Sequence, residues 1–381
     1  MLNIRKLRGV YLASKNMEDC KTREYGIYKK MMAQYAVFEQ RYEMRFVSRG
    51  WKRDMIHKVL ARLPFFPSDF GVPISLVPSD VDFVFFRFDL GDRQTIRFLK
   101  RVREVNPQCK IIIEVPTYPL AWPTLKWYTK LIRPKHKYCE DRLHFYADCV
   151  AFYGSNTTLY GLPVLNISNG IDLNSVPMRK IREYDDEGID ILSVSAMAPG
   201  HAVDRMIEGI GQYYHKGGTR RITLHVVGEG QDTKRCKELA ASYELEEKVI
   251  FHGYQKDDAL KAIDDMCDIC LEMLGGYRID NNYSSTLKSR EYWAKGMPIL
   301  TAAVYPDEVA EISSCIFQCP NDASPVDVEA LIDFYDALFD GGKWRTKLDR
   351  ALFIRDFAQR HYGIEKTMDK IFRYIDRRGE E

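Results

Sequence analysis

Apolar positions in the first 172 residues form short runs that alternate with longer amphipathic stretches. "RGVYLAS", "VDFVFFRF" and "CKIIIEVP" are short and rich in Val, Ile and Phe, which predicts buried strands. "EYGIYKKMMAQYAVFEQ" and "RQTIRFLKRVREV" repeat apolar residues at helical spacing, which predicts helices between those strands. This alternation is typical of a parallel sheet with crossover helices, and therefore of an α/β fold.

The alternation starts again after the acidic stretch "REYDDEGID" at residues 182–190. Strands are predicted at "IDILSVSAMA", "ITLHVVGEG", "KVIFHGY" and "MPILTAA", with helices between them. We therefore predict two Rossmann-like domains in tandem, at residues 1–175 and 186–355, and a C-terminal helical segment at 356–381. Open α/β sheets bind ligands beyond the carboxyl ends of their strands, so a cleft between the two domains is the expected site.

Charge is divided unevenly between the two halves. The net charge is only +2, but residues 1–172 hold 28 Lys and Arg against 17 Asp and Glu, and the remainder holds 28 against 37. The basic half either faces an anionic partner such as a membrane surface or attracts the acidic half across the cleft, and the pattern leaves both readings open. No apolar run approaches the 18 residues of a membrane-spanning helix.

The nine cysteines are scattered, which favours a reducing cytoplasm. Cys267 and Cys270 have the spacing of a metal or redox pair, but no second pair or histidine cluster accompanies them. Their setting, "AIDDMCDICLEML", predicts a core strand instead. We therefore expect no metal site.

Residues 281–300, "NNYSSTLKSREYWAKGMPIL", place hydroxyl and charged side chains before a stop at Gly-Met-Pro. A helix is predicted to begin at Ser284 or Ser285, because serine caps the first free amides of a helix. Lys288 and Glu291 then lie on the same face of this helix as Ser284. A helix start that carries a lysine binds anions, whereas a Lys288–Glu291 pair on a surface helix is the alternative. The position of the helix between the last core strands of the second domain favours the anion site.

The run "SSTLKSREYWAKGMPIL" resembles the donor-site signature of family 4 of the retaining glycosyltransferases, which have the GT-B fold. That signature is a glutamate, seven residues, a second glutamate, and then a small residue, Gly and Pro. Glu291 matches the second glutamate, which binds the ribose of the nucleotide in the family, whereas Tyr283 stands where the first is expected. The resemblance implies that the C-terminal helix packs back on the first domain, and that the donor meets Ser284, Ser285 and Thr286.

Two further runs of the second domain are similar to the same family. "LSVSAMAPGHAVDRMIEGI" looks like its first strand and loop, where an arginine and a Lys-Gly hold the diphosphate, but here Ala196 and His201-Ala202 stand in their place. We therefore expect His201 to contact the donor, and Arg205 and Lys288 to supply the catalytic positive charge. "HVVGEGQDTKRCKELAASYELEEKVIFHGY" resembles the glycine turn, helix and nucleobase strand, which implies a close turn at Gly228 and Gly230 and a base pocket near Tyr254.

The first domain looks like the subgroup that builds bacterial surface polysaccharides, through "FVFFRF", "IIIEVPTYP" and "LPVLNISNGID". Glu114, Thr117 and Tyr118 are expected at the carboxyl end of a strand, facing the cleft, and are our acceptor-side candidates, although "EVPTYP" also suits a proline-stiffened turn. Residues 49–66 and 122–138 mix Trp, Phe and Tyr with Lys and Arg. They predict peripheral contact with an anionic membrane, an ordinary basic surface being the alternative. Nothing resembles a nucleic-acid-binding module.

The expected function is a retaining glycosyltransferase of the hexosyltransferase class. It would move a sugar from a nucleotide-sugar donor, expected to be UDP-linked, to a lipid-linked or oligosaccharide precursor of a surface polysaccharide, without a cofactor. Its expected location is the cytoplasm, at the inner face of the membrane. The alternatives are a non-catalytic sugar-nucleotide-binding partner of a polysaccharide assembly complex and a nucleotide-sugar epimerase on the same fold.

Overall fold

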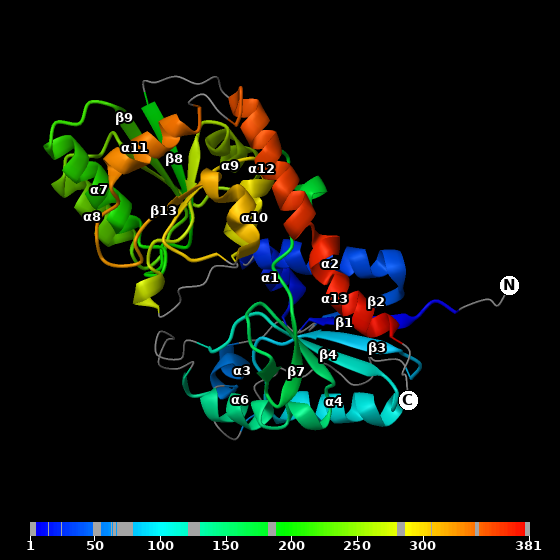
Figure 1. Cartoon of the computed structure of the whole chain (residues 1–381). Coiled ribbons are helices and arrows are strands. Elements are labelled where there is room, and N and C mark those ends of the chain that lie inside the picture. The colour runs from blue at the N-terminus through cyan, green and yellow to red at the C-terminus, as the bar shows by residue number, and fades with distance from the viewer. Residues whose placement is uncertain are drawn as a thin grey trace. The chain divides into compact units, whose positions relative to one another are not determined.

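The structure is a computed structural model that describes residues 5–13, 15–23, 25–48, 55–61, 63, 66, 79–120, 130–181, 188–279, 286–305, 307–339 and 343–377. The chain divides into two compact units, Met1–Gly170 with Ile364–Glu381, and Ile171–Gly363. Each unit contains one largely parallel sheet with helices packed on it (Figure 1). The predicted α/β class with two parallel-sheet domains is therefore confirmed.

The sheet of the first unit has the strand order β2-β1-β3-β4-β5-β7-β6 and is parallel except for the β6–β7 pair. Alternate residues of β1 enter two different cores, which explains why the strand reads as a continuous apolar run. Its strands are β1 (Arg8–Ala13), β2 (Glu43–Ser48), β3 (Phe83–Arg87), β4 (Lys110–Val115), β5 (Cys149–Phe152), β6 (Thr158–Leu159) and β7 (Leu162–Asn166).

Helices cover both faces of this sheet (Figure 1). Helices α4 and α6 pack on one face, whereas α2 and α13 pack on the other, where Phe38 of α2 meets Phe372 of α13 edge to face. The predicted packing of the C-terminal helix on the first domain is thus confirmed. The helices of the unit are α1 (Met17–Arg23), α2 (Tyr25–Arg41), α3 (Met55–Leu60), α4 (Arg93–Val105), α6 (Arg133–Glu140), the short η3 (Leu143–Phe145) and α13 (Ile364–Asp376).

The sheet of the second unit has the order β10-β9-β8-β11-β12-β13, and all of its pairs are parallel. Its strands are β8 (Gly188–Val194), β9 (Arg221–Val227), β10 (Val249–Gly253), β11 (Ile269–Leu271), β12 (Ile299–Thr301) and β13 (Ile316–Gln318). Cys267 and Cys270 are fully buried in its core, as the apolar setting of the pair predicts.

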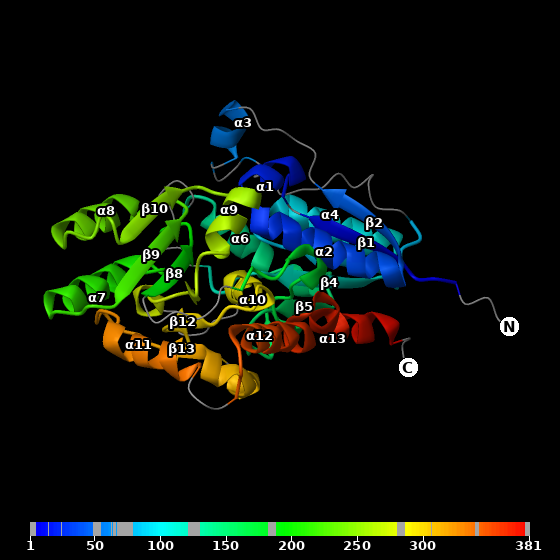
Figure 2. The ribbon, with the colours of Figure 1, turned by 90° about the horizontal axis from the view of Figure 1, so that it is seen from above.

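Helices α7 and α8 pack against each other in this unit, and α10 lies beside α12 (Figure 2). The helical elements are η4 (Leu173–Ser175), α7 (Val203–His215), α8 (Thr233–Ser242), α9 (Asp257–Asp264), η5 (Gly276–Arg278), α10 (Leu287–Ala294), η6 (Asp307–Cys315), α11 (Val328–Ala337) and α12 (Lys347–Tyr362). The helical tail breaks at Gly363, so α12 belongs to the second unit. The guanidinium of Arg355 keeps it there by donating to the carbonyls of Leu173 at 2.9 Å and Val176 at 2.8 Å.

Candidate functional site

Two loops of the second unit meet at the carboxyl edge of its sheet. They follow the neighbouring strands β8 and β11, and the carboxyl ends of parallel strands share one edge. The backbone amide of Leu274 donates to the carbonyl of His201 at 3.2 Å, and that of Gly275 to Gly200 at 3.1 Å. A side chain at Gly275 would lie 2.4 Å from the carbonyl oxygen of Pro199, so the close contact between the loops requires glycine.

Lys288, the second residue of α10, contacts both of these loops. Its Nζ lies 3.0 Å from His201 Nδ1 and donates to the carbonyl oxygen of Glu272 at 2.5 Å. Glu291 instead pairs with Lys295 at 3.1 Å, so the alternative of a Lys288–Glu291 surface pair is wrong. The structure therefore brings together Lys288 and His201, two predicted donor-site residues that lie 87 positions apart.

Burial sets the charge of this pair. Burial lowers the pKa of Lys288 to about 8, against an opposing effect of the Glu272 carboxylate. Burial and the neighbouring Lys288 lower the pKa of His201 to about 3. At pH 7 Lys288 is therefore a charged donor and His201 is a neutral acceptor at Nδ1, which places the imidazole proton on Nε2. The pair combines a positive charge with a second N–H donor.

Glu272, which sequence analysis missed, directly follows β11 and is fully buried. Its carboxylate accepts from Thr301 Oγ1 at 2.7 Å, from the hydroxyl of Tyr305 at 2.9 Å and from Thr286 Oγ1 at 2.5 Å. Thr286 is also the N-cap of α10, because its Oγ1 accepts from the amide of Ser289. Glu272 thus fixes the start of the helix that carries Lys288.

The predicted start of this helix at Ser284 or Ser285 is wrong, since α10 begins at Leu287 and Thr286 caps it. The threonine caps in place of the serines because Glu272 also holds its hydroxyl. Ser284 and Ser285 themselves lie outside the described residues, as does Tyr283.

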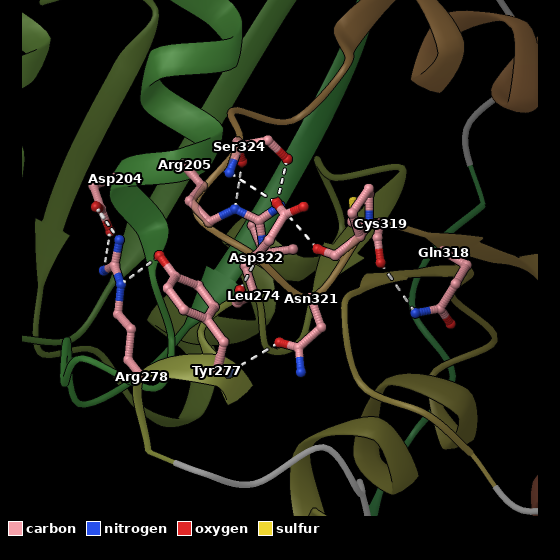
Figure 3. A network of polar contacts seen from close by, with 11 residues as sticks. Asp204, Arg205, Leu274, Tyr277, Arg278, Gln318, Cys319, Asn321, Asp322 and Ser324 are labelled. Carbon is pink, nitrogen blue, oxygen red and sulfur yellow. Dashed lines mark hydrogen bonds and ion pairs between the residues drawn. The ribbon is translucent and has the colours of Figure 1, made fainter.

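Arg205 lies in α7 and is completely buried (Figure 3). Its guanidinium donates to three carbonyl oxygens, at 2.6 Å to Leu274, 2.6 Å to Ser324 and 3.0 Å to Pro320. These contacts join α7 to the loops after β11 and β13. They do not support the predicted role of Arg205 as a catalytic cation, because the side chain is completely buried and each of its three nitrogens already donates to a backbone carbonyl.

A second arginine stabilises the same loops (Figure 3). Arg278 donates to both carboxylate oxygens of Asp204 at 2.8 and 2.7 Å, and its Nε donates to the hydroxyl of Tyr277. The backbone amide of Tyr277 in turn donates to Asn321 Oδ1 at 3.0 Å. Bidentate arginine–carboxylate pairs are rigid, so η5 is held in place before any ligand arrives.

The glycine turn after β9 makes the close approach that its resemblance implies. A side chain at Gly228, whose φ is +109°, would lie 2.0 Å from the Ser195 carbonyl oxygen, and one at Gly230 would lie 1.8 Å from that of Ala196. Only glycine fits at either position. A hollow of about 660 Å³ adjoins the turn and is lined by Glu229, Gly230, Thr233, Lys234, Lys237 and Glu238. Tyr254 follows β10 and is exposed, and it does not line this hollow.

In the first unit, Glu114 lies in a buried ionic network instead of on an accessible acceptor surface. Its carboxylate lies 3.3 Å from Lys30 Nζ and 3.1 Å from Arg87 Nη1, and it accepts from Gln34 at 3.0 Å and from the hydroxyl of Tyr153. Burial alone would raise the pKa of Glu114, but Lys30 and Arg87 lower it to about 2. Glu114 is fully buried, so the prediction that it faces a cleft is wrong.

The other two acceptor-side candidates, Thr117 and Tyr118, are exposed. Tyr118 lines a hollow of about 540 Å³ in the first unit, and its ring meets that of Tyr160 edge to face at 5.5 Å. Thr117 does not line it. The remaining lining residues are Pro119, Leu120, Arg133, Lys137, Glu140, Asp141, His144 and Gly161. Aromatic rings beside both carboxylates and cations are suited to a polar ligand with apolar faces.

The described part of the chain lacks both a metal-binding cluster and a membrane-spanning helix. No group of three His, Cys, Asp or Glu side chains there could hold a metal ion. None of the described helices is long and apolar enough to cross a membrane.

Residues 177–272 match the family model described as "Glycosyl transferases group 1". The match spans β8, His201, the glycine turn and Glu272, and it ends before α10. No curated protein is a recognisable sequence relative of the chain.

Solved structures resemble the whole chain. Sucrose-phosphate synthase from Thermosynechococcus elongatus is similar with a TM-score of 0.63 and 13% identity, over 97% of this chain and 99% of that one. A glycosyltransferase from Rickettsia africae has a TM-score of 0.57 and 13% identity, over 97% and 98% of the two chains. Anabaena HepE in complex with UDP has a TM-score of 0.56 and 12% identity, over 97% and 99%. These likenesses confirm the GT-B fold, and the matched segment has the sequence pattern of group 1 glycosyl transferases.

Proposed function

We propose that the protein is a glycosyltransferase that moves a sugar from a nucleotide-sugar donor to a saccharide or lipid-linked acceptor. The observation that carries this proposal is the Lys288–His201 pair at the carboxyl edge of the second sheet. It lies beside the segment that matches the group 1 glycosyl transferases. Retention of configuration, the hexosyl class and a surface-polysaccharide precursor as acceptor are implied by the family resemblance and form part of the proposal.

The chemistry follows from where negative charge develops. When the bond between sugar and diphosphate breaks, the leaving diphosphate gains charge, and donors already in place lower that barrier. Lys288 supplies an ammonium, His201 supplies its Nε2–H, and the start of α10 supplies free backbone amides. The described contacts of Lys288 Nζ are to a neutral ring nitrogen and a carbonyl oxygen, so no carboxylate of the described residues cancels its charge in a direct ion pair.

Two observations support the choice of donor and acceptor. HepE, which shares this fold, has been solved in complexes with UDP and with UDP and glucose, and a UDP-linked sugar is therefore our proposed donor. The hollow beside Tyr118 has the aromatic and carboxylate groups that sugars require, and we assign the acceptor to it. No cofactor or metal forms part of the proposed reaction, because Lys288 supplies the positive charge.

A peripheral membrane contact is also part of the proposal. Ile56 and Val59 of α3 are 69% and 52% exposed, and they lie within the basic stretch 49–66. Lys135 of the second basic stretch donates to the carbonyls of Ala61 at 2.8 Å and Phe66 at 2.5 Å, so the two stretches adjoin in the first unit. Exposed apolar side chains on a basic surface favour anionic lipid. Sedimentation with anionic vesicles, compared for the wild type and an I56E/V59E variant, tests this contact.

A donor screen tests the proposed function. Thermal shifts with a panel of nucleotide diphosphate sugars identify the donor, and product analysis with lipid extract as acceptor follows transfer. We expect Lys288→Met to lose turnover and Lys261→Met, a change at an exposed residue of α9, to keep it. Binding without turnover would favour the non-catalytic partner, and a nucleotide sugar with altered configuration would favour the epimerase. If no nucleotide sugar binds, the proposed function is wrong.

A further inference from the structure

Two arginines of the second unit are buried away from the proposed donor site. Arg350 lies in α12 and is completely buried, and Arg179 lies in the segment before β8 and is 3% exposed. Both are close to Asp268, which precedes β11, whereas Glu272 of the donor site follows that strand. The arginines and the donor site are therefore at opposite ends of β11.

Five of the six guanidinium nitrogens of Arg350 and Arg179 have no hydrogen-bond acceptor among the described residues. Among the residues that the structure describes, none accepts a hydrogen bond from Nε, Nη1 or Nη2 of Arg350, or from Nε or Nη2 of Arg179. The remaining nitrogen of Arg179 donates to the adjacent Lys180 carbonyl at 3.3 Å. Buried polar groups in folded proteins are nearly always satisfied by protein, water or an ion, so five such nitrogens in two neighbouring side chains require a partner.

The nearby acidic groups are already paired. Asp268 lies 3.4 Å from Lys347, and Asp264 lies 2.7 Å from Lys295. These pairs balance two positive and two negative charges, whereas no ion pair within the described ranges reaches Arg350 or Arg179. Within the described part of the chain, the two arginine charges are thus left without a counter-ion in the interior, where an unpaired charge is strongly unfavourable.

An aromatic contact does not replace the missing acceptor. The guanidinium carbon of Arg350 lies 4.6 Å from the centre of the Phe339 ring, which stabilises the charge but accepts none of the in-plane N–H groups. Burial lowers the pKa of Arg350 to about 10, and the neighbouring positive charge of Arg179 contributes to this decrease. The side chain is still charged at pH 7.

We propose that Arg350 and Arg179 together form an internal binding site for a small oxyanion, of which inorganic phosphate is the representative. The planar guanidinium fork matches the paired oxygens of a tetrahedral oxyanion, and two forks can bind one anion from two sides. A chloride ion is a single acceptor atom and lacks the two separate oxygens that match the fork, so it should bind more weakly. Arg179 lies where the chain enters the second unit and Arg350 lies in its last helix, so the anion would join the two ends of this unit. The inference does not depend on the proposed function.

Thermal unfolding and calorimetric titration in sodium phosphate and in sodium chloride of equal ionic strength test the site. We expect phosphate at a hundredfold excess over its Kd to raise the Tm of the wild type by on the order of 5 °C. Lys288→Met is the control for phosphate that binds at the donor site. Phosphate should raise the Tm of this variant as much as it raises that of the wild type. Arg350→Met and Arg179→Met should each lose the phosphate-induced rise in Tm. If Arg350→Met does not fold, Arg179→Met alone tests the site.

The stability of Arg350→Met in chloride adds a further test. Because the variant removes a charge without an internal partner, it should be at least as stable as the wild type there. An equal Tm of the wild type in both salts would overturn the proposal, as would a phosphate shift that persists in both arginine variants. A loss of stability in Arg350→Met that is equal in the two salts would show that Arg350 has a partner within the protein, and would overturn it as well.

Discussion

Lys30 in the first unit and Lys288 in the second are two lysines with the same pKa and different partners. Burial lowers the pKa of each to about 8. Lys30 lies 3.3 Å from the carboxylate of Glu114 and 3.8 Å from the centre of the Tyr153 ring. Lys288 contacts His201 Nδ1 and the backbone carbonyl of Glu272.

The difference shows that the partner of a buried lysine indicates its role better than its pKa does. The charge of Lys30 is neutralised within the protein, so the residue stabilises the fold. The charge of Lys288 has neutral acceptors at hydrogen-bond distance, and no described residue forms an ion pair with it, so an anionic ligand can bind it.

Replacing Glu114 by Gln should have the largest effect, on stability. The change leaves Lys30 and Arg87 buried without their shared counter-ion, which costs about 3–5 kcal/mol of unfolding free energy. Denaturant unfolding measures this loss. Lys30→Met is the matched control and should cost less, because Arg87 still pairs with Glu114. A loss below about 1 kcal/mol for Glu114→Gln would remove the structural role of this network.

Lys288→Met should mainly reduce catalysis. Removing one donor that stabilises a developing negative charge lowers kcat by about 100- to 1000-fold. The unfolding free energy should change little, because the lysine loses only a hydrogen bond to a neutral ring and one to a carbonyl. Steady-state kinetics with the donor found by screening, alongside Lys261→Met, measures the effect. A variant that keeps its rate but unfolds easily would make Lys288 structural, like Lys30.

Alkaline pH should separate activity from stability. Lys288 loses its proton above about pH 8, so kcat/KM should fall tenfold per pH unit there. Both lysines have folded pKa values below the 10.5 of the free side chain, so between pH 8 and 10.5 the unfolded chain binds more protons and stability should rise. Lys288→Arg, which stays charged, should lack the alkaline fall in whatever activity it retains. A wild-type pH profile that is flat to pH 10 would contradict the assignment.

Glu272→Gln should have the smallest effect. The glutamine can still accept from Thr301 and Tyr305, but it removes the negative charge that raises the pKa of Lys288. The alkaline fall of kcat/KM should therefore begin at lower pH, with a loss of only a few-fold at pH 7. If the profile keeps its position and only stability falls, then Glu272 acts solely as a structural residue.

Much of this architecture could be predicted from local patterns. Apolar periodicity predicted the alternating elements because central strands such as β1, β3 and β4 are buried on both faces. The turn at Gly228 and Gly230 followed from a motif whose backbone geometry excludes side chains. Lys288 was found because its helix follows a loop between core strands.

The rest depends on contacts between distant parts of the chain. Glu272 is hidden in the apolar run "CDICLEML", and only folding brings Thr286, Thr301 and Tyr305 to its carboxylate. Arg205 has the sequence position of an anion-binding residue, yet carbonyls 69 to 119 residues away satisfy it. Sequence patterns show which residue types are present, but not which acceptors are already occupied.

The most direct test of the central claim is calorimetric titration of the wild type and Lys288→Met at pH 7 with UDP and with uridine. We expect uridine to bind both proteins equally, whereas UDP should bind Lys288→Met at least about tenfold more weakly, a loss of roughly 1.4 kcal/mol. Equal UDP affinity in the two proteins would contradict this claim, because the charge of Lys288 would then not be available to the diphosphate.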